Sequence, residues 1–178
     1  MPEHFRFAVK LPREITHDRR LVDAAAPLEQ FLDEIQPLEA RLGPLLVQLP
    51  PSLAYDAPAA EAFLDLLRNR FGGEVACEPR HASWFEADAD VMLCRHRVAR
   101  VAADPARVPA AAQPGGWPGL AYYRLHGSPR MYYSAYDSGY LDQLATALAT
   151  RQGPVWCVFD NTASGAAAGN ALELAGGG

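Results

Sequence analysis

Short apolar runs alternate with segments of helical periodicity along nearly the whole chain, and this alternation limits the fold more than any other feature. The runs predict strands at residues 5–11, 44–49, 74–78, 98–103, 120–126 and 155–159. Helical spacing predicts helices at 26–42, 59–71, 86–95, 140–151 and 166–174. Most strands are apolar at every position, which is typical of a parallel sheet buried on both faces. The sequence therefore predicts an α/β fold built from βα units.

Proline and glycine mark the expected boundaries of these elements. Pro37 should kink or split the helix at 26–42, because proline cannot donate the intrahelical hydrogen bond, and Gly43 suits the end of that helix. Residues 105–118 are rich in Pro, Ala and Gly and should form a loop. We expect a single domain over residues 1–175 and a frayed glycine tail at 176–178.

Charge and cysteine usage argue against several classes of partner. The 178 residues carry a formal net charge of −5, so no bulk positive field attracts nucleic acid or an anionic membrane. No apolar run approaches the length of a membrane span, and no signal peptide precedes the first strand. Cys77, Cys94 and Cys157 form no CxxC pair, which indicates structural thiols. We therefore expect a cytoplasmic protein that does not bind membranes and for which nucleic acid is a disfavoured partner.

Polar side chains gather where each predicted strand ends. They are Lys10 and His17; Gln48; Glu78, Arg80, His81 and Trp84; Asp104; Arg124, His126, Tyr132 and Tyr136; and Asp160 and Asn161. Because ligands of parallel sheets lie at the carboxyl ends of the strands, these residues predict a site at that edge.

The charged and amide side chains each have a structural alternative. Glu78 is either a site residue or one half of a buried salt bridge, since buried charges are retained when they are paired. Lys10 lies one residue before its strand ends, where a lysine without an anionic partner is costly, which favours a site role. Gln48 lies in an apolar run and needs a hydrogen-bond partner if it is buried.

The histidines and aromatic residues are also open to two interpretations. His17 is either a hydrogen-bonding group at a helix start or a site residue. His126 either donates to a backbone carbonyl or lines a site, where Gly127 would let a ligand approach the backbone. Trp84 and the tyrosines of the loop after His126 either pack internally or form walls for an aromatic or sugar ring.

The common cofactor motifs are absent from the sequence. The chain contains no HxH, HExxH, close carboxylate pair, glycine-rich phosphate loop or GxSxG. Imidazole and carboxylate groups occur on several different strands, so a divalent metal is the less favoured interpretation. We predict no cofactor.

The motifs resemble the DUF72, or YecE-like, family, whose function is unknown. The resemblance rests on stretches that occur in the family's order and cover nearly the whole chain: FRFAVKLPREITH, LLVQLPPS, CEPRHASW, AADPA, YYRLHG followed by YYSAYDSGYL, and DNTASGAAAGNAL. It implies a TIM-barrel-like fold with the polar motifs at its carboxyl mouth. The site residues it implies are Lys10, His17, Gln48, Glu78, Arg80, Trp84, Asp104, Arg124, His126, Tyr132, Tyr136 and Asn161. The family's last motif usually reads Asn-Asn, so the role of Asp160 stays open, as does that of His81.

One departure from the family concerns the start of the chain. Family members usually begin with two further βα units, and this chain begins at what resembles the third strand. A closed eight-stranded barrel typically needs ~250 residues. The resemblance therefore implies a truncated barrel, incomplete at the N-terminus, with about six βα units and two open strand edges. We expect either a second copy, in a homo-oligomer, to cover these edges or the chain to be an impaired fragment.

The balance of charges at the strand ends favours one function over two others. Cations and hydrogen-bond donors outnumber carboxylates there, which suits a small ligand bearing phosphate or carboxylate. We hypothesise an enzyme or binder for such a ligand, with Glu78, Lys10 and His126 in catalytic roles and a Glu or His as general acid or base. One alternative is a metal-dependent phosphodiesterase or nuclease, by analogy of fold. The other is a non-catalytic interaction module or a degenerate fragment.

Overall fold

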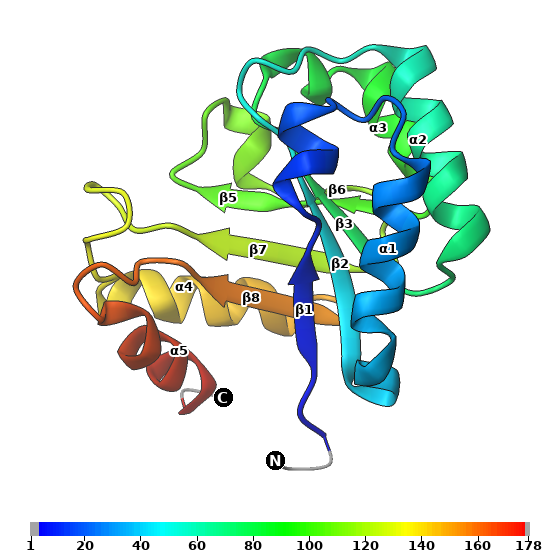
Figure 1. Cartoon of the computed structure of the whole chain (residues 1–178). Coiled ribbons are helices and arrows are strands. Elements are labelled where there is room, and N and C mark those ends of the chain that lie inside the picture. Colours follow the sequence, from blue (N-terminus) through cyan, green and yellow to red (C-terminus); the bar gives the residue numbers. More distant parts are fainter. Residues whose placement is uncertain (1–3, 177–178) are drawn as a thin grey trace.

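The computed structural model describes residues 4–176, which form an α/β fold with two sheets (Figure 1). The first sheet has the order β1-β2-β3-β4-β6, in which the first four strands are parallel and β6 is antiparallel. Its strands are β1 (Phe7–Lys10), β2 (Leu42–Gln48), β3 (Val75–Glu78), β4 (Val98–Arg100) and β6 (Gly115–Gly116). The parallel arrangement predicted from the continuous apolar runs is confirmed.

The second sheet is parallel and has the order β5-β7-β8. Its strands are β5 (Ala102–Asp104), β7 (Ala121–Leu125) and β8 (Val155–Phe159). The single strand expected at 98–103 is thus divided at Val101, whose N–H still donates to Cys77 O at 2.9 Å. Strand β4 pairs with β3, whereas β5 pairs with β7, so the chain passes from one sheet to the other at this residue.

The helices follow the predicted pattern with shifted ends. They are α1 (Ala25–Ile35), α2 (Ala57–Arg70), α3 (Ala87–Arg95), α4 (Ser138–Ala149) and α5 (Ala166–Gly176). The short helical turns are η1 (Glu14–Asp18), η2 (Gln36–Arg41), η3 (Ala82–Phe85) and η4 (Pro109–Ala112). Helix α5 continues through Gly176, where a frayed tail was expected, and residues 177–178 lie outside the described residues.

The expected helix at 26–42 shows how proline divides an element. The α-helix ends at Ile35, and the 3₁₀ turn η2 contains Pro37 at its start. The predicted split is therefore confirmed, but Gly43 does not terminate the helix. The chain turns instead at Glu39, which has a positive φ of 46°, and Gly43 lies within β2.

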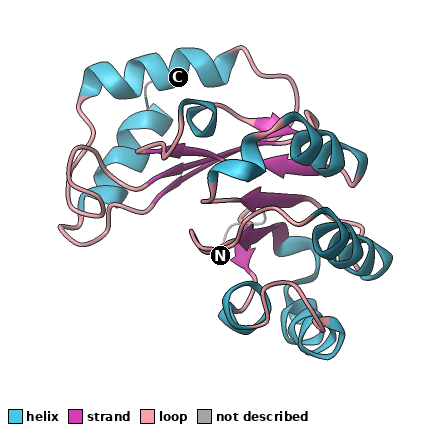
Figure 2. Cartoon of the chain, turned by 90° about the horizontal axis from the view of Figure 1, so that it is seen from above, coloured by secondary structure: helices cyan, strands magenta, loops and turns pink. Residues whose placement is uncertain are grey.

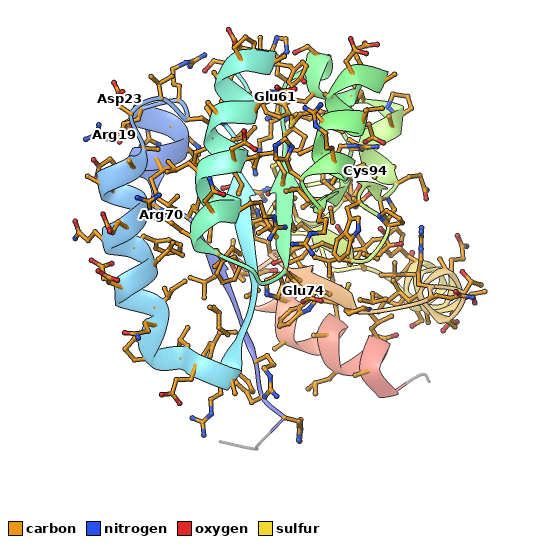
Figure 3. All side chains as sticks on the ribbon, turned by 90° about the vertical axis from the view of Figure 1, so that its right-hand side faces the viewer. Arg19, Asp23, Glu61, Arg70, Glu74 and Cys94 are labelled. Atoms are coloured by element: carbon orange, nitrogen blue, oxygen red, sulfur yellow. The ribbon has the colours of Figure 1, made fainter. Side chains whose placement is uncertain are left out.

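The helices lie at the periphery and the strands between them (Figure 2). One apolar cluster joins helices α1, α2 and α3 to the first sheet, the side seen in Figure 3, and includes Leu28, Phe63 and Leu93. A second cluster joins α4 and α5 to the outer face of β5, β7 and β8. Both clusters use the apolar stripe of each helix, as expected for helices that cover a sheet.

A third apolar cluster fills the space enclosed by the inner faces of the two sheets. It contains Leu46, Ala76, Ala99 and Tyr122, and Trp156 packs against it. These residues alternate along each strand with residues of the outer clusters, as the two-residue period of a strand requires. The interior is therefore a packed core with a surface at the carboxyl ends of the strands.

Strands β1 and β8 are the outer strands of this arrangement. Within residues 4–176, β1 pairs with β2 alone and β8 pairs with β7 alone. A closed cylinder of strands is therefore not formed by the described part of the chain. None of the described helices combines the length and apolarity that crossing a membrane requires.

Candidate functional site

The inward-facing positions at the carboxyl ends of the strands carry polar side chains, and we call this surface the carboxyl edge. Each polar residue comes two positions after an apolar residue of the interior cluster, so both face the same side of the strand. Gln48 follows Leu46, Glu78 follows Ala76, Arg124 follows Tyr122, Asp160 follows Val158, and Lys10 follows Ala8. The parallel register places Gln48 directly beside Glu78. One alternation therefore produces both the interior core and the site above it.

Four of these side chains form a closed ring of hydrogen bonds. Arg124 joins the two carboxylates, with Nη1 2.5 Å from Glu78 Oε2 and Nη2 2.8 Å from Asp160 Oδ2. His126 joins the same two carboxylates on the other side, with Nε2 3.0 Å from Glu78 Oε1 and Nδ1 3.0 Å from Asp160 Oδ2. We call Glu78, Arg124, His126 and Asp160 the charged ring. It links β3, β7 and the end of β8, which are far apart in the sequence.

The protonation of the charged ring follows from these contacts. Glu78 is only 3% exposed, and burial alone would raise its pKa. The hydrogen bond with His126 and the charges of Arg124 and Arg80 outweigh burial and lower the pKa of Glu78 to about 2. Burial alone would lower the pKa of His126, but hydrogen bonds to Asp160 and Glu78 raise it above its ordinary value. The hydrogen bond with His126 lowers the pKa of Asp160.

These shifts describe an imidazolium held between two carboxylates. A histidine that donates from both ring nitrogens must carry both protons, and two carboxylate acceptors stabilise that form. With His126 protonated, the ring contains two negative groups and two positive groups. Its internal charges balance, and its two carboxylates are already engaged by partners within the protein.

Two further predicted residues attach to Glu78 from outside the ring. Gln48 Nε2 donates to Glu78 Oε2 at 2.9 Å, which gives the half-buried amide the partner it needs. Arg80 Nη2 lies 3.4 Å from Glu78 Oε1, and its side chain is 22% exposed. Arg80 therefore reaches from the buried carboxylate toward solvent.

A cationic group of residues lies beside the ring, near the carboxyl end of β1. His17 is half-buried on the π-helical turn η1, and Thr16 Oγ1 is 2.8 Å from its Nδ1. Burial lowers the pKa of His17, and the positive charges of Arg13, Lys10 and Arg80 lower it further. Lys10 is exposed and makes no ion pair with any described residue. The structure therefore brings Lys10, His17 and Arg80 into one positive region.

A small pocket opens between these groups and the following loops. Its volume is ≈ 30 Å³. Its charged walls are Glu78, Arg80, His126 and Arg107, and Met131 contributes an apolar wall. Arg107 and Met131 lie in loops without regular periodicity, so the strand pattern that marked the other residues could not identify them.

Three predicted residues hold the loop after β7 instead of joining the charged ring. The Tyr136 hydroxyl donates to Asp104 Oδ2 at 2.7 Å and accepts from Gly127 N at 2.8 Å. Asn161 Nδ2 donates to Ser134 O at 3.0 Å. Asp104 follows Ala102, which belongs to the outer cluster, so the alternation of the strand turns its carboxylate away from the ring.

The remaining predicted residues occupy different places. Trp84 is 2% exposed within the outer core, where Nε1 donates to Leu53 O at 3.0 Å, so the structure does not bring it to the carboxyl edge. Tyr132 is 39% exposed, and its ring centroid lies 5.8 Å from that of His126. His81 Nδ1 lies 2.9 Å from Ser83 Oγ at the start of η3.

Asp160 is the site residue whose role the sequence left open. It belongs to the charged ring through contacts with both Arg124 and His126. The available signal was its position two residues after the inward-facing Val158. Among residues 4–176, no group of three or more His, Cys, Asp or Glu side chains has an arrangement that could hold a metal ion.

Comparisons with known proteins place this arrangement in a family. A UPF0759 protein YecE from Escherichia coli K12 is 34% identical over 84 residues, which are 47% of this chain and 30% of that protein. The chain thus matches less than a third of the length of this curated relative. A solved DUF72 family protein from Thermotoga maritima is 29% identical with a TM-score of 0.82, over 99% of this chain and 74% of that one.

A second solved structure shares the fold at lower sequence identity. This DUF72 family protein from Enterococcus faecalis is 24% identical with a TM-score of 0.78, over 98% of this chain and 78% of that one. The family model described as "Protein of unknown function DUF72" matches residues 1–176. With nearly its whole length covered by that model, the chain belongs to the DUF72 family.

Proposed function

We propose that this protein binds a small anionic ligand, bearing phosphate or carboxylate, at the carboxyl edge. The observation that carries the proposal is the unequal pairing of charges there. Glu78 and Asp160 are engaged by Arg124 and His126, whereas Lys10 and Arg107 have no ion pair among the described residues. Arg80 makes only a long contact with Glu78, with 3.4 Å between Nη2 and Oε1, so its charge is only partly neutralised. The edge is therefore left with excess positive charge in a chain whose net charge is −5.

The lowered pKa of His17 supports the same proposal. Its nearest charged groups include three cations, and their repulsion disfavours a proton on the imidazole. A bound anion would offset that repulsion and raise the pKa of His17. Guanidinium groups such as those of Arg80 and Arg107 suit phosphate and carboxylate oxygens because they can donate two parallel hydrogen bonds.

The same groups could support acid–base chemistry on the ligand. Glu78 stays ionised because its pKa is about 2, so its role would be to hold the proton on His126. His126 lines the pocket and would be the proton donor, a role that requires one ring N–H to leave its carboxylate partner, Glu78 or Asp160, for the ligand. Lys10 would stabilise negative charge on the ligand. These are the catalytic roles that we propose if the protein is an enzyme.

We further propose that the two sheets represent six strands of a (β/α)₈ barrel. The spatial order β1-β2-β3-β4/β5-β7-β8, the peripheral helices and the packed interior support this interpretation. The greater length of the solved DUF72 proteins, of which the chain spans 74–78%, also supports it.

Calorimetric titration with inorganic phosphate at low ionic strength tests the proposed ligand binding. We expect saturable binding that weakens at least tenfold in Lys10→Ala and in Arg80→Ala. Arg70→Ala is the matched control, because Arg70 is exposed at the C-terminal end of α2, away from the carboxyl edge (Figure 3). Absence of binding by phosphate and by simple carboxylates, or equal losses in all three variants, would contradict the proposal.

A second candidate function is an interaction through the open strands. Within residues 4–176, β1 and β8 each have one side without a strand partner, and exposed strand edges pair readily with other chains. We propose a second copy of this chain as the partner. No observation on the described residues favours the metal-dependent phosphodiesterase alternative.

A further inference from the structure

The loop between β7 and α4 carries exposed apolar side chains beside the proposed anion site. Met131, Tyr132 and Tyr133 are exposed by 36%, 39% and 47%. Met131 lines the same pocket as Arg80 and His126, and the Tyr132 ring lies edge-on to the His126 ring. Apolar surface and cationic groups therefore meet within one small region.

Hydrogen bonds hold this loop in place, so the exposed rings are preorganised. Tyr132 O accepts from Ala163 N at 3.0 Å, and Tyr133 O accepts from Ser164 Oγ at 2.6 Å. The base of the loop is fixed by the bond between Gly127 N and the Tyr136 hydroxyl. A fixed loop that leaves large apolar groups in water is typical of a contact surface.

The backbone of Tyr132 gives an independent indication of function. Its φ is +69°, a strained conformation that a bulky non-glycine residue rarely adopts. Strain of this kind persists where the surrounding structure imposes it, and it clusters at ligand-binding sites. The Arg130 guanidinium lies 3.9 Å from the centroid of the Tyr133 ring, so that ring already has a partner within the loop.

We infer that the anion bound at the carboxyl edge is joined to a flat ring, as in an aryl phosphate or a nucleoside monophosphate, and that Met131 and Tyr132 contact this ring. The inference rests on the proposed anion binding. Arg80, Arg107 and Lys10 attract the charged end, and the apolar wall accepts the ring. Tyrosine and a flat ring stack favourably, because both faces are apolar and polarisable.

The test compares methyl phosphate, cyclohexyl phosphate and phenyl phosphate by calorimetric titration of the whole chain. These compounds carry the same charged group, so their affinities differ through the attached group. We expect phenyl phosphate to bind about tenfold more tightly than methyl phosphate, as expected for one stacked ring. We expect cyclohexyl phosphate, which is similar in size but not flat, to bind less tightly than phenyl phosphate.

Variants of the loop between β7 and α4 test whether its side chains cause the preference for phenyl phosphate over methyl phosphate. Tyr132→Asn removes the ring and tolerates the positive φ, so it should abolish the preference for phenyl phosphate while methyl phosphate still binds. Tyr132→Phe should retain the preference, and Met131→Ala should reduce it. Phe5→Ala is the matched control, because Phe5 is 41% exposed and precedes the N-terminal end of β1, away from the carboxyl edge.

The outcomes separate this inference from the proposed function. Equal affinity for methyl and phenyl phosphate, or for cyclohexyl and phenyl phosphate, would overturn the inference that the ligand carries a flat ring. The proposed anion binding would still stand. A preference that survives in Tyr132→Asn overturns the role of Tyr132. Binding of none of the three phosphates overturns the proposed function for phosphate and the inference with it.

Discussion

At the scale of single residues, the charged ring determines the electrostatics of the carboxyl edge. Glu78 keeps its charge at 3% exposure because Arg124, His126 and Gln48 all contact its two oxygens. A buried carboxylate without such partners would instead take up a proton. The same contacts make each member of the ring depend on the others.

Replacing Glu78 by Gln should destabilise the fold. Arg124 and His126 would then be buried beside a neutral amide, and breaking a buried ion pair typically costs about 3–5 kcal/mol. We expect a loss of that order in the free energy of unfolding, measured by urea denaturation at pH 6. Glu29→Gln on the exposed face of α1 is the control and should change the free energy little. A loss of unfolding free energy no larger than that of the control would contradict a stabilising role for the charged ring.

The raised pKa of His126 predicts how stability depends on pH. Its folded-state pKa lies above the unfolded value of about 6.5, so its contribution is complete below pH 6.5 and is lost as pH rises through the folded-state pKa. The difference in unfolding free energy between the wild type and His126→Gln should therefore shrink as pH increases from 6 to 9. Urea denaturation at each pH measures this difference. A difference that grows with pH would show that His126 is neutral in the ring.

At the scale of elements, the two sheets are joined by packing across the interior. The Trp156 ring of β8 lies so close to Gly43 of β2 that a Cβ at Gly43 would come within 2.6 Å of it. The glycine is thus required by this close approach, and not by the end of a helix. The contact holds the outer strand β8 against the first sheet.

Adding a methyl group at Gly43 tests this contact. We expect Gly43→Ala to lower the free energy of unfolding by about 1–3 kcal/mol, the usual cost of overpacking a core. The cost should fall in a Trp156→Phe background, because the ring atoms that clash are absent. Gly169→Ala, at an open position of α5, should instead stabilise by about 0.5–1 kcal/mol. Equal effects at the two glycines would exclude the close contact.

At the scale of the whole molecule, the outer strands β1 and β8 are the edges at which we propose that a second copy of the chain associates. Both strands offer backbone groups without a strand partner among the described residues, and neither is covered by β6 or by another described strand. Such edges favour pairing with another chain. The proposed second copy would cover them without changing the charged ring.

Light scattering coupled to size-exclusion chromatography tests this association. We expect a mass of about twice 19.3 kDa, falling toward 19.3 kDa on dilution if the pairing is reversible. Hydrogen exchange should show protection of β1 and β8 that depends on protein concentration, whereas protection of β3 should not. A mass of 19.3 kDa at every concentration would reject the dimer.

Much of the architecture could be predicted from the sequence, because strand and helix periodicity are local properties of the chain. The parallel α/β fold, the split at Pro37 and the polar residues at the strand ends all follow from spacing and residue type. The division of residues 98–104 into β4 and β5 could not be predicted, because it depends on which strand each half meets. The same limit applies to Gly43, whose role is set by Trp156 more than a hundred positions away.

The site shows the same division between local pattern and tertiary contact. The sequence by itself determined that Glu78, Arg124 and His126 end strands of a parallel sheet, because apolar runs and their polar ends are encoded locally. Only the tertiary structure decided that Asp160 completes the ring, that Asp104 faces the outer side and that Trp84 lies in the core. The physical reason is register and face. The alignment of neighbouring strands decides which inward-facing side chains lie side by side. That alignment is fixed by packing between distant parts of the chain.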